Sequence, residues 1–260
     1  MAKTALITGA SGGIGEEFAK IFAREKFNLV LVARSADKLL TLANDLQSKH
    51  GITVKVIPKD LAKHESPDEL FAELQQAGMQ IDVLVNNAGY ATYGPFSEIP
   101  LKTELDEMQL NMVTLTHLTK LFLPGMVQRR DGKILNVAST AAFQPGPLMA
   151  VYYATKAYVL SLSEALAEEL NGTGVTVTAL CPGPTESGFQ QRAAMTESKL
   201  VQGKLMTAKE VAEAGYQSMM KGQRVIVTGM MNKVMAFTTR FMPRNMLSRF
   251  VMNMQKRVEH

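Results

Sequence analysis

The sequence has little that would support disulfide bonds, metal ligation or membrane insertion. Its single cysteine, Cys181, excludes an internal disulfide bond. Its histidines have no ligand spacing with one another or with that cysteine, so we expect no metal site: His50, His64, His117 and His260. No stretch approaches the roughly 18 apolar residues of a membrane-spanning helix, and the N-terminus lacks the pattern of a secretory signal. We therefore expect a cytoplasmic protein.

Acidic side chains are almost absent from residues 221–260. This segment carries a net charge of +7, with Glu259 as its only acidic residue, whereas residues 1–220 carry −3. Proteins that bind nucleic acid are often basic, but here the positive charge is confined to one segment. The charge distribution therefore argues against a nucleic-acid partner.

Short apolar runs alternate with helical patterns along most of the chain. The runs lie at residues 5–8, 29–32, 54–57, 83–85, 133–137, 175–180 and 225–227, and helical patterns lie at about 14–24, 35–50, 68–77, 102–128 and 152–171. Buried parallel strands with helices on both faces give this alternation, and right-handed crossovers then produce a doubly wound sheet. We predict a single Rossmann-type α/β domain over residues 1–260, with about seven strands, a core at about 3–228 and a helical extension at about 230–258.

A glycine-rich turn joins the first predicted strand to the first helix. It reads Thr8-Gly9-Ala10-Ser11-Gly12-Gly13-Ile14-Gly15. Glycine permits a positive φ and lets a phosphate approach the backbone without a Cβ atom in the way. The free N–H groups at a helix start bind anions. Any tight strand-to-helix turn can be rich in glycine, but the strand before it and the helix after it favour nucleotide binding.

The end of the second predicted strand indicates which dinucleotide would bind. Sites for NAD usually place a carboxylate there, which binds the ribose 2′-hydroxyl, whereas this chain reads Ala33-Arg34-Ser35. An arginine can pair with a 2′-phosphate through two hydrogen bonds. The alternative is a solvated Arg34 at a helix start, where the dipole disfavours positive charge. The sequence therefore favours NADP(H).

Tyr152 and Lys156 lie four residues apart in a helical pattern and therefore share a helix face. A tyrosine with its ordinary pKa near ~10 is a poor acid–base group at neutral pH, and a nearby ammonium group lowers that pKa. Neither Tyr153 nor Tyr158 has a lysine four residues further on. Such pairs are common on helix surfaces, so this one alone does not identify a catalytic site.

Six motifs occur in the order and spacing of the short-chain dehydrogenase/reductase family, which the chain resembles over about residues 3–228. They are the glycine-rich turn, residues 86–89 (Asn-Asn-Ala-Gly), Asn111, Ser139, Tyr152 with Lys156, and Pro182-Gly183. The pair Ala33-Arg34 resembles the NADP-preferring members. The whole chain is similar to bacterial members of unassigned substrate whose tails are rich in methionine and arginine.

The resemblance implies a catalytic role for four residues. Tyr152 would give a proton to a carbonyl oxygen as hydride reaches its carbon, or remove it in the reverse direction. Lys156 would hold the nicotinamide ribose and keep the tyrosine acidic. Ser139 would hydrogen-bond the reacting oxygen, and Asn111 would hold a water that links Lys156 to solvent. The nicotinamide itself would supply the redox chemistry.

The resemblance also implies which residues contact NADP(H). These are Gly9, Ser11, Gly12, Gly13, Ile14, Gly15, Arg34, Ser35, Asp60, Leu61, Asn87, Ala88, Gly89, Tyr152, Lys156, Pro182, Gly183 and Thr185. Asp60 is expected near the adenine. Thr185, expected at the carboxamide, falls slightly earlier than in many relatives.

Two apolar segments are expected to border the substrate, residues 141–149 and 189–206. Their members Phe143, Leu148, Met149, Phe189 and Met195 favour an apolar ketone or acyl chain over a sugar or nucleotide. The predicted function is an NADP(H)-dependent oxidoreductase acting on a small, apolar carbonyl or alcohol substrate. We expect a homodimer or homotetramer.

Two other functions share parts of this pattern. A non-catalytic NADP(H)-binding regulatory or scaffold protein would have the fold, but it would not require Asn111, Ser139, Tyr152 and Lys156 together. A sugar-nucleotide epimerase or dehydratase has a Tyr–Lys pair on a similar fold. Such enzymes generally prefer NAD and carry a larger C-terminal domain than the segment expected after residue 227.

The C-terminal extension has an apolar helical stripe, formed by Met246, Leu247, Phe250, Val251 and Met254. The basic residues Arg244, Arg249, Lys256 and Arg257 lie mostly off this stripe. An earlier segment, residues 234–241, adds Phe237 and Phe241. The ordinary interpretation is packing on the same domain or on a second subunit. The alternative is that residues 230–258 lie on an anionic membrane surface beside the substrate site.

Overall fold

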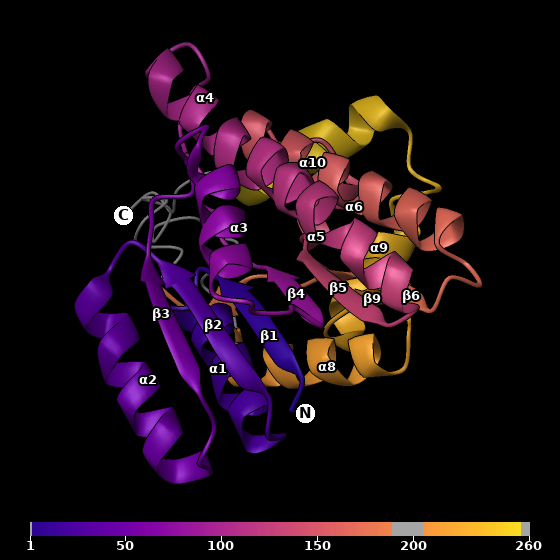
Figure 1. Cartoon of the computed structure of the whole chain (residues 1–260). Helices are drawn as coiled ribbons and strands as arrows, with labels where there is room; N and C mark the ends of the chain where they lie inside the picture. The colour runs from indigo at the N-terminus through magenta and orange to yellow at the C-terminus, as the bar shows by residue number, and fades with distance from the viewer. Residues whose placement is uncertain (1, 189–204, 256–260) are drawn as a thin grey trace.

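Seven parallel strands form one sheet in the computed structural model, which describes residues 2–188 and 205–255 (Figure 1). They are β1 (Thr4–Thr8), β2 (Asn28–Ala33), β3 (Val54–Pro58), β4 (Val83–Asn86), β5 (Gly132–Val137), β6 (Val175–Cys181) and β9 (Val225–Val227). The strand order is β3-β2-β1-β4-β5-β6-β9. The order reverses between β1 and β4, and ligands bind at such switch points in doubly wound sheets. The predicted Rossmann-type architecture is confirmed.

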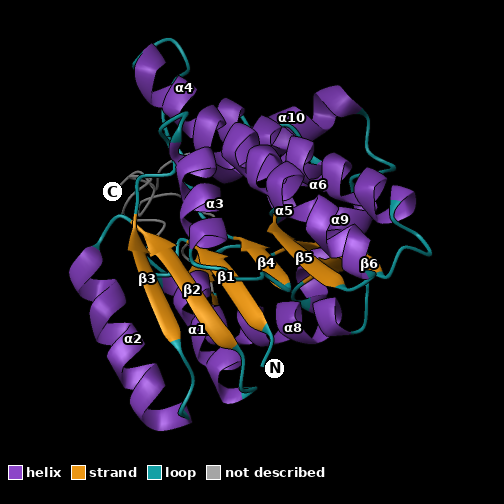
Figure 2. Ribbon diagram, in the orientation of Figure 1, coloured by secondary structure: helices purple, strands orange, loops and turns teal. Residues whose placement is uncertain are grey.

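Helices cover both faces of the sheet (Figure 2). One face packs against α1 (Gly13–Arg24), α2 (Ala36–His50) and α8 (Ala208–Met220), and the other against α3 (Ser66–Gln76), α5 (Leu115–Arg129) and α6 (Ala150–Glu169). Beyond β9 lie α9 (Met230–Thr238) and α10 (Arg244–Gln255). Within the described ranges, none of the helices has the length and apolar content needed to cross a bilayer.

Strand β1 illustrates why the two faces need helices. Ala5 and Ile7 point into the core beneath α1 and α2, where Phe18 packs, whereas Leu6 joins the opposite core with Leu70. All of these side chains are fully buried. Because successive side chains of a strand point to opposite faces, a strand that is apolar throughout requires cover on both sides.

Some details of the predicted elements differ in the structure. The predicted helical pattern at residues 35–50 begins one residue later in the structure, at Ala36, and Gly51 ends α2 in the left-handed conformation. The helical pattern at residues 102–128 contains a π-helical turn, Gln109–Thr114, between α4 (Leu101–Met108) and α5. Helix α8 and the two-stranded pairing of Thr185–Glu186 (β7) with Met206–Thr207 (β8) were not apparent from the sequence pattern.

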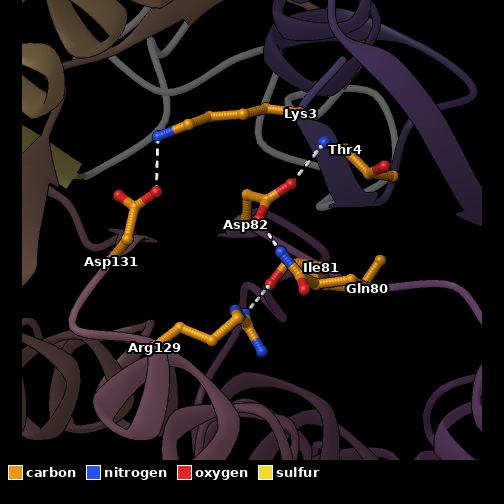
Figure 3. A network of polar contacts seen from close by, with 7 residues as sticks. All are labelled: Lys3, Thr4, Gln80, Ile81, Asp82, Arg129 and Asp131. Atoms are coloured by element: carbon orange, nitrogen blue, oxygen red, sulfur yellow. Dashed lines mark hydrogen bonds and ion pairs between the residues drawn. The ribbon is translucent and has the colours of Figure 1, made fainter. Parts of the chain in front are cut away.

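Polar contacts fasten the amino-terminal ends of β1 and β4 to each other (Figure 3). The buried carboxylate of Asp82 accepts hydrogen bonds from the backbone N–H of Thr4 at 2.8 Å and from Nε2 of Gln80 at 2.6 Å. Arg129 on α5 donates to the carbonyl oxygen of Ile81 at 3.0 Å. These contacts fix the register of the central strands, whose carboxyl ends form the candidate site.

Candidate active site

The turn after β1 requires glycine at several positions. Gly9 and Gly13 have φ values of +68° and +57°, which side chains rarely adopt. A Cβ atom on Gly15 would lie 2.4 Å from the carbonyl oxygen of Gly9 and 2.5 Å from Nδ2 of Asn87. The turn therefore closes tightly, and the first N–H groups of α1 face the open side, where an anion can bind.

Asn87, directly after β4, holds this turn in place. Its Nδ2 donates to the carbonyl oxygen of Thr8 at 2.9 Å. The hydroxyl oxygen of Thr8 accepts hydrogen bonds from the backbone N–H groups of Asn87 and Ala88, each at 3.0 Å. The loops after β1 and β4, which flank the switch point, thus form one rigid unit.

A cleft of about 1270 Å³ runs along the carboxyl ends of the strands. All but two of the residues predicted to bind the cofactor or to act in catalysis line it. Of these two, Gly15 packs beneath the turn, and Asn111 lies directly behind Gly89, where a Cβ atom would be 2.9 Å from Oδ1 of Asn111. Several other residues line the cleft that no sequence motif indicated, including Lys38, Tyr90, Tyr153 and Met235.

One end of the cleft is rich in positive charge. Arg34 and Lys38, at the start of α2, both line it and are exposed. Lys49 and Lys59 line the same end, but they pair with Asp45 and Glu69, each at 2.7 Å. Among the described residues, no ion pair involves Arg34 or Lys38. This end therefore offers two cations to an anionic ligand.

Asn111 lies within the π-helical turn and is buried. Its Nδ2 donates to the carbonyl oxygen of Tyr90 at 2.9 Å and to the hydroxyl of Thr155 at 3.2 Å, and its Oδ1 accepts from the backbone N–H of Tyr90 at 3.2 Å. The side chain thus ties the loop after β4 to α6. Wide helical turns often occur at functional sites, and the water expected at Asn111 stays a prediction.

Ser139 and Tyr152 lie together at the other end of the cleft. Ser139 follows β5, and its hydroxyl accepts a hydrogen bond from the backbone N–H of Ala141 at 3.1 Å. Burial raises the pKa of Tyr152, and a hydrogen bond with Ser139 lowers it by a smaller amount. The direction is opposite to the lowering expected from the sequence, because desolvation of the phenol dominates. Tyr152 is therefore protonated at neutral pH, which is the form that a proton donor requires.

Lys156 lies one turn after Tyr152 on α6 and is buried. Its Nζ atom donates to the carbonyl oxygen of Val137 at 2.7 Å and lies 5.6 Å from the ring centroid of Tyr152. Burial lowers the pKa of Lys156 to about 8, and the negative charge of Glu107 raises it by a smaller amount. The ammonium group is thus fixed beneath the cleft.

Glu107 is a buried acid that the sequence analysis missed. Its side chain is fully buried, and Oε2 accepts hydrogen bonds from the backbone N–H and the hydroxyl of Thr92, each at 2.9 Å. Burial raises its pKa to about 7. One feature of the sequence could have indicated Glu107. It lies four residues before Asn111, and that spacing puts both side chains on the same side of a helix.

The expected substrate residues separate into three groups. Met149 lines the cleft and is buried, and so is Tyr153, which was not among the expected substrate residues. Phe143 does not line it, because its ring packs with the core between β6 and α6, and Leu148 does not line it either. The expected residues Phe189 and Met195 lie outside the described residues.

Comparison with known proteins bears on this geometry. The sequence profile of the short chain dehydrogenases matches residues 3–198. The chain belongs to this family. Its members use nicotinamide cofactors, in agreement with the expected cofactor class, and act as oxidoreductases on small molecules.

Relatives of this short-chain dehydrogenase include proteins with named substrates. A very-long-chain 3-oxoacyl-CoA reductase of Phaeosphaeria nodorum is 40% identical over 177 residues, which is 66% of this chain and 52% of that protein. The chain thus spans about half the length of the curated relatives it matches.

Two solved structures are similar over most of the chain. A short-chain dehydrogenase of Sphingobium yanoikuyae in complex with NADPH has a TM-score of 0.83 and 32% identity, covering 92% of this chain and 93% of that one. A bulky-bulky ketone specific alcohol dehydrogenase of Comamonas testosteroni has a TM-score of 0.78 and 30% identity, covering 92% of each chain.

Proposed function

We propose that this short-chain dehydrogenase is an NADPH-dependent reductase of apolar carbonyl compounds. The carrying observation is the placement of Ser139, Tyr152 and Lys156 at one end of a cleft whose other end holds the glycine-rich turn and Arg34. The nicotinamide cofactor, when bound, would supply the hydride. Tyr152 then donates its proton to the developing alkoxide, while the Ser139 hydroxyl hydrogen-bonds the same oxygen.

The preference for NADPH is supported by the charged end of the cleft. The tight turn leaves its N–H groups open to a pyrophosphate, and a Cβ at Gly9 or Gly15 would collide with the loops that form it. Arg34 and Lys38 lie where the second strand ends, the position at which an NAD site carries its carboxylate. Both cations are suited to a ribose 2′-phosphate.

The substrate is proposed to be a bulky ketone or a 3-oxoacyl thioester. Met149 and Tyr153 give the reaction end of the cleft an apolar wall. The names of two relatives support these classes, since one reduces very-long-chain 3-oxoacyl-CoA and the other is specific for bulky ketones. The same proposal includes homo-oligomerisation and a single domain over residues 1–260. It also includes a cytoplasmic location and a peripheral membrane contact through residues 230–258.

The test is NADPH oxidation by the purified chain with ketones, aldehydes and 3-oxoacyl thioesters of increasing chain length. We expect turnover with apolar ketones or thioesters, much faster with NADPH than with NADH. NADPH binding by calorimetry without turnover of any compound would instead support a non-catalytic binding protein. Turnover confined to sugar nucleotides would contradict the proposed substrate class.

A further inference from the structure

The two C-terminal helices and the turn between them expose an unusual amount of apolar surface. Half of the exposed large apolar side chains among the described residues fall between residues 230 and 250. They are Met230, Met231, Val234, Met235, Phe237, Phe241, Met246 and Phe250, and their exposed fractions range from 38 to 76%. Contiguous apolar surface on a soluble domain usually marks a binding face.

On α9 the apolar side chains point outward rather than into the core. Met230, Val234 and Phe237 follow one another at intervals of four and three residues, so they share one helix face, and Phe241 continues it after the helix. The rings of Phe237 and Phe241 pack edge to face, with centroids 5.2 Å apart. Ala236 is the buried residue of this helix. The amphipathic helix α9 thus presents its apolar side to solvent.

On α10 the predicted apolar stripe divides into two halves. Leu247 and Val251 are buried in a cluster with Met149 and Tyr153, so the packing interpretation is correct for this half. Met246 and Phe250, on the adjoining side of the helix, stay exposed. The helix is therefore anchored on its own domain and still has apolar side chains for a partner.

The charged residues of this segment are all positive. Residues 230–255 contain Lys233, Arg240, Arg244 and Arg249 and no acidic residue. All four are exposed, and none forms an ion pair with a described residue. Exposed methionine and phenylalanine side chains interspersed with unpaired cations are typical of elements that rest in the interface of an anionic bilayer.

This surface lies beside the reaction end of the cleft. Met235 belongs to α9 and lines the cleft, and the side chain of Asn232 packs directly on Gly183 of the loop after β6. The ring of Tyr152 packs against the cluster that holds Leu247 and Val251. In Figure 1 both helices, drawn in yellow, lie on the side of the molecule occupied by α6.

We propose that the outward face of α9 and α10 docks on an anionic lipid surface, so that the cleft opens beside the bilayer. The phenylalanine and methionine side chains enter the interface, and the four cations contact lipid phosphates and anionic headgroups. An apolar substrate can then pass from the lipid to the site without crossing water. This last step rests on the proposed reaction, whereas the docking, which deepens the proposed membrane contact, rests on the surface alone.

Co-sedimentation with vesicles of phosphatidylcholine, with or without phosphatidylglycerol, tests the docking. The full chain should sediment with the anionic vesicles at low salt and detach as salt screens the charges. The double substitution Phe237→Ser with Phe241→Ser should lower the partition coefficient by about tenfold or more. A matched control is Phe96→Ser with Leu101→Ser, which removes side chains of 67 and 72% exposure elsewhere and should leave sedimentation unchanged.

Circular dichroism and reduction of a water-soluble ketone check that each variant is folded. The proposal is overturned if the full chain does not bind anionic vesicles, or if the two double variants sediment equally. It is also overturned if Phe237→Ser with Phe241→Ser only dissociates a dimer in ultracentrifugation, because the face is then a subunit interface. Sedimentation is scored without substrate or cofactor, so a failure of docking is distinguishable from a failure of the proposed reaction.

Discussion

The Nζ atom of Lys156 lies 5.6 Å from the ring centroid of Tyr152 and is held there by a hydrogen bond to the carbonyl oxygen of Val137. Lys156 is buried and Tyr152 is partly buried, and burial moves their pKa values in opposite directions, up for the tyrosine and down for the lysine. Each shift favours the neutral form. The pair is therefore sensitive to any further charge nearby, and Glu107 supplies one.

The first prediction concerns the pH dependence of this pair. The pKa of Lys156 is about 8, so its ammonium form, which is the one proposed to act, is lost as pH rises through that value. We expect kcat/KM for NADPH, which reports groups of the free enzyme, to fall on the alkaline side with an apparent pKa near 8. Because the charge of Glu107 raises the pKa of Lys156, Glu107→Gln should move this limb to lower pH.

Glu104→Gln is the matched control for that shift. Glu104 is also buried and accepts a hydrogen bond from Thr92, at 3.3 Å, but its charge does not contribute to the pKa shift of Lys156. Its pH profile should match that of the parent. An unchanged alkaline limb in Glu107→Gln would refute the assigned coupling, because glutamine keeps the size of the side chain and removes only the charge.

The second prediction concerns cofactor choice. Removing one charge-assisted contact costs roughly 1.5–3 kcal/mol, or about one to two decades of affinity. Arg34→Ala should therefore weaken NADPH binding by that factor and leave NADH binding nearly unchanged, as measured by calorimetry. Lys49→Ala, in the same end of the cleft but already paired with Asp45, should affect neither. Equal dissociation constants of the parent for NADPH and NADH would sink the assignment.

The third prediction separates two glycines of the turn. A Cβ atom on Gly15 would lie 2.4 Å from backbone, whereas one on Gly12 would meet nothing within 4 Å in a backbone that is extended, with φ 171°. Gly15→Ala should lower the free energy of unfolding by about 1–3 kcal/mol, and Gly12→Ala by less than about 0.5 kcal/mol. Urea denaturation of the apo-protein measures both. Equal losses would mean that the turn is less tightly packed than described.

The fourth prediction tests the contacts at the amino-terminal ends of β1 and β4, which lie away from the cleft (Figure 3). Asp82→Ala leaves the buried N–H of Thr4 without its acceptor and should cost about 2–4 kcal/mol of unfolding free energy. Lys3→Ala removes an ion pair with Asp131 in which both side chains are about half exposed, and should cost less than about 1 kcal/mol. Similar losses for the two variants in urea denaturation would contradict this distinction.

Local sequence patterns predicted the sheet and the glycine-rich turn of the candidate cofactor site. Apolar runs such as residues 29–32 predicted helices on both faces of the sheet. The glycines of the turn predicted that backbone segments approach each other closely. Arg34 was expected in the cleft from its position at the end of the second strand, whereas the more distant Pro182 was expected there from the family resemblance, and both line the cleft.

What the sequence could not give depends on tertiary packing. Tyr153 lines the cleft, whereas the side chain of Phe143 packs in the core. The orientation of α6 and of the turn before it decides which side chain faces the cleft. The upward pKa shift of Tyr152 likewise follows from burial by distant segments, a term absent from a four-residue spacing. The effect of Glu107 on Lys156 depends on the burial of its side chain. A glutamate in a helical sequence pattern does not reveal that it is buried.

The most direct test of the central claim is single-turnover oxidation of bound NADPH by Tyr152→Phe, with a ketone that the parent reduces. The substitution removes only the hydroxyl, so the rate should fall by ~10²–10⁴-fold, with the NADPH dissociation constant unchanged within a factor of about two. Tyr158→Phe is the control, since its hydroxyl lies on the same helix and contacts Thr116, and its rate should equal that of the parent. A Tyr152→Phe rate within a factor of about two of the parent would contradict the account, because it would show that another group gives the proton.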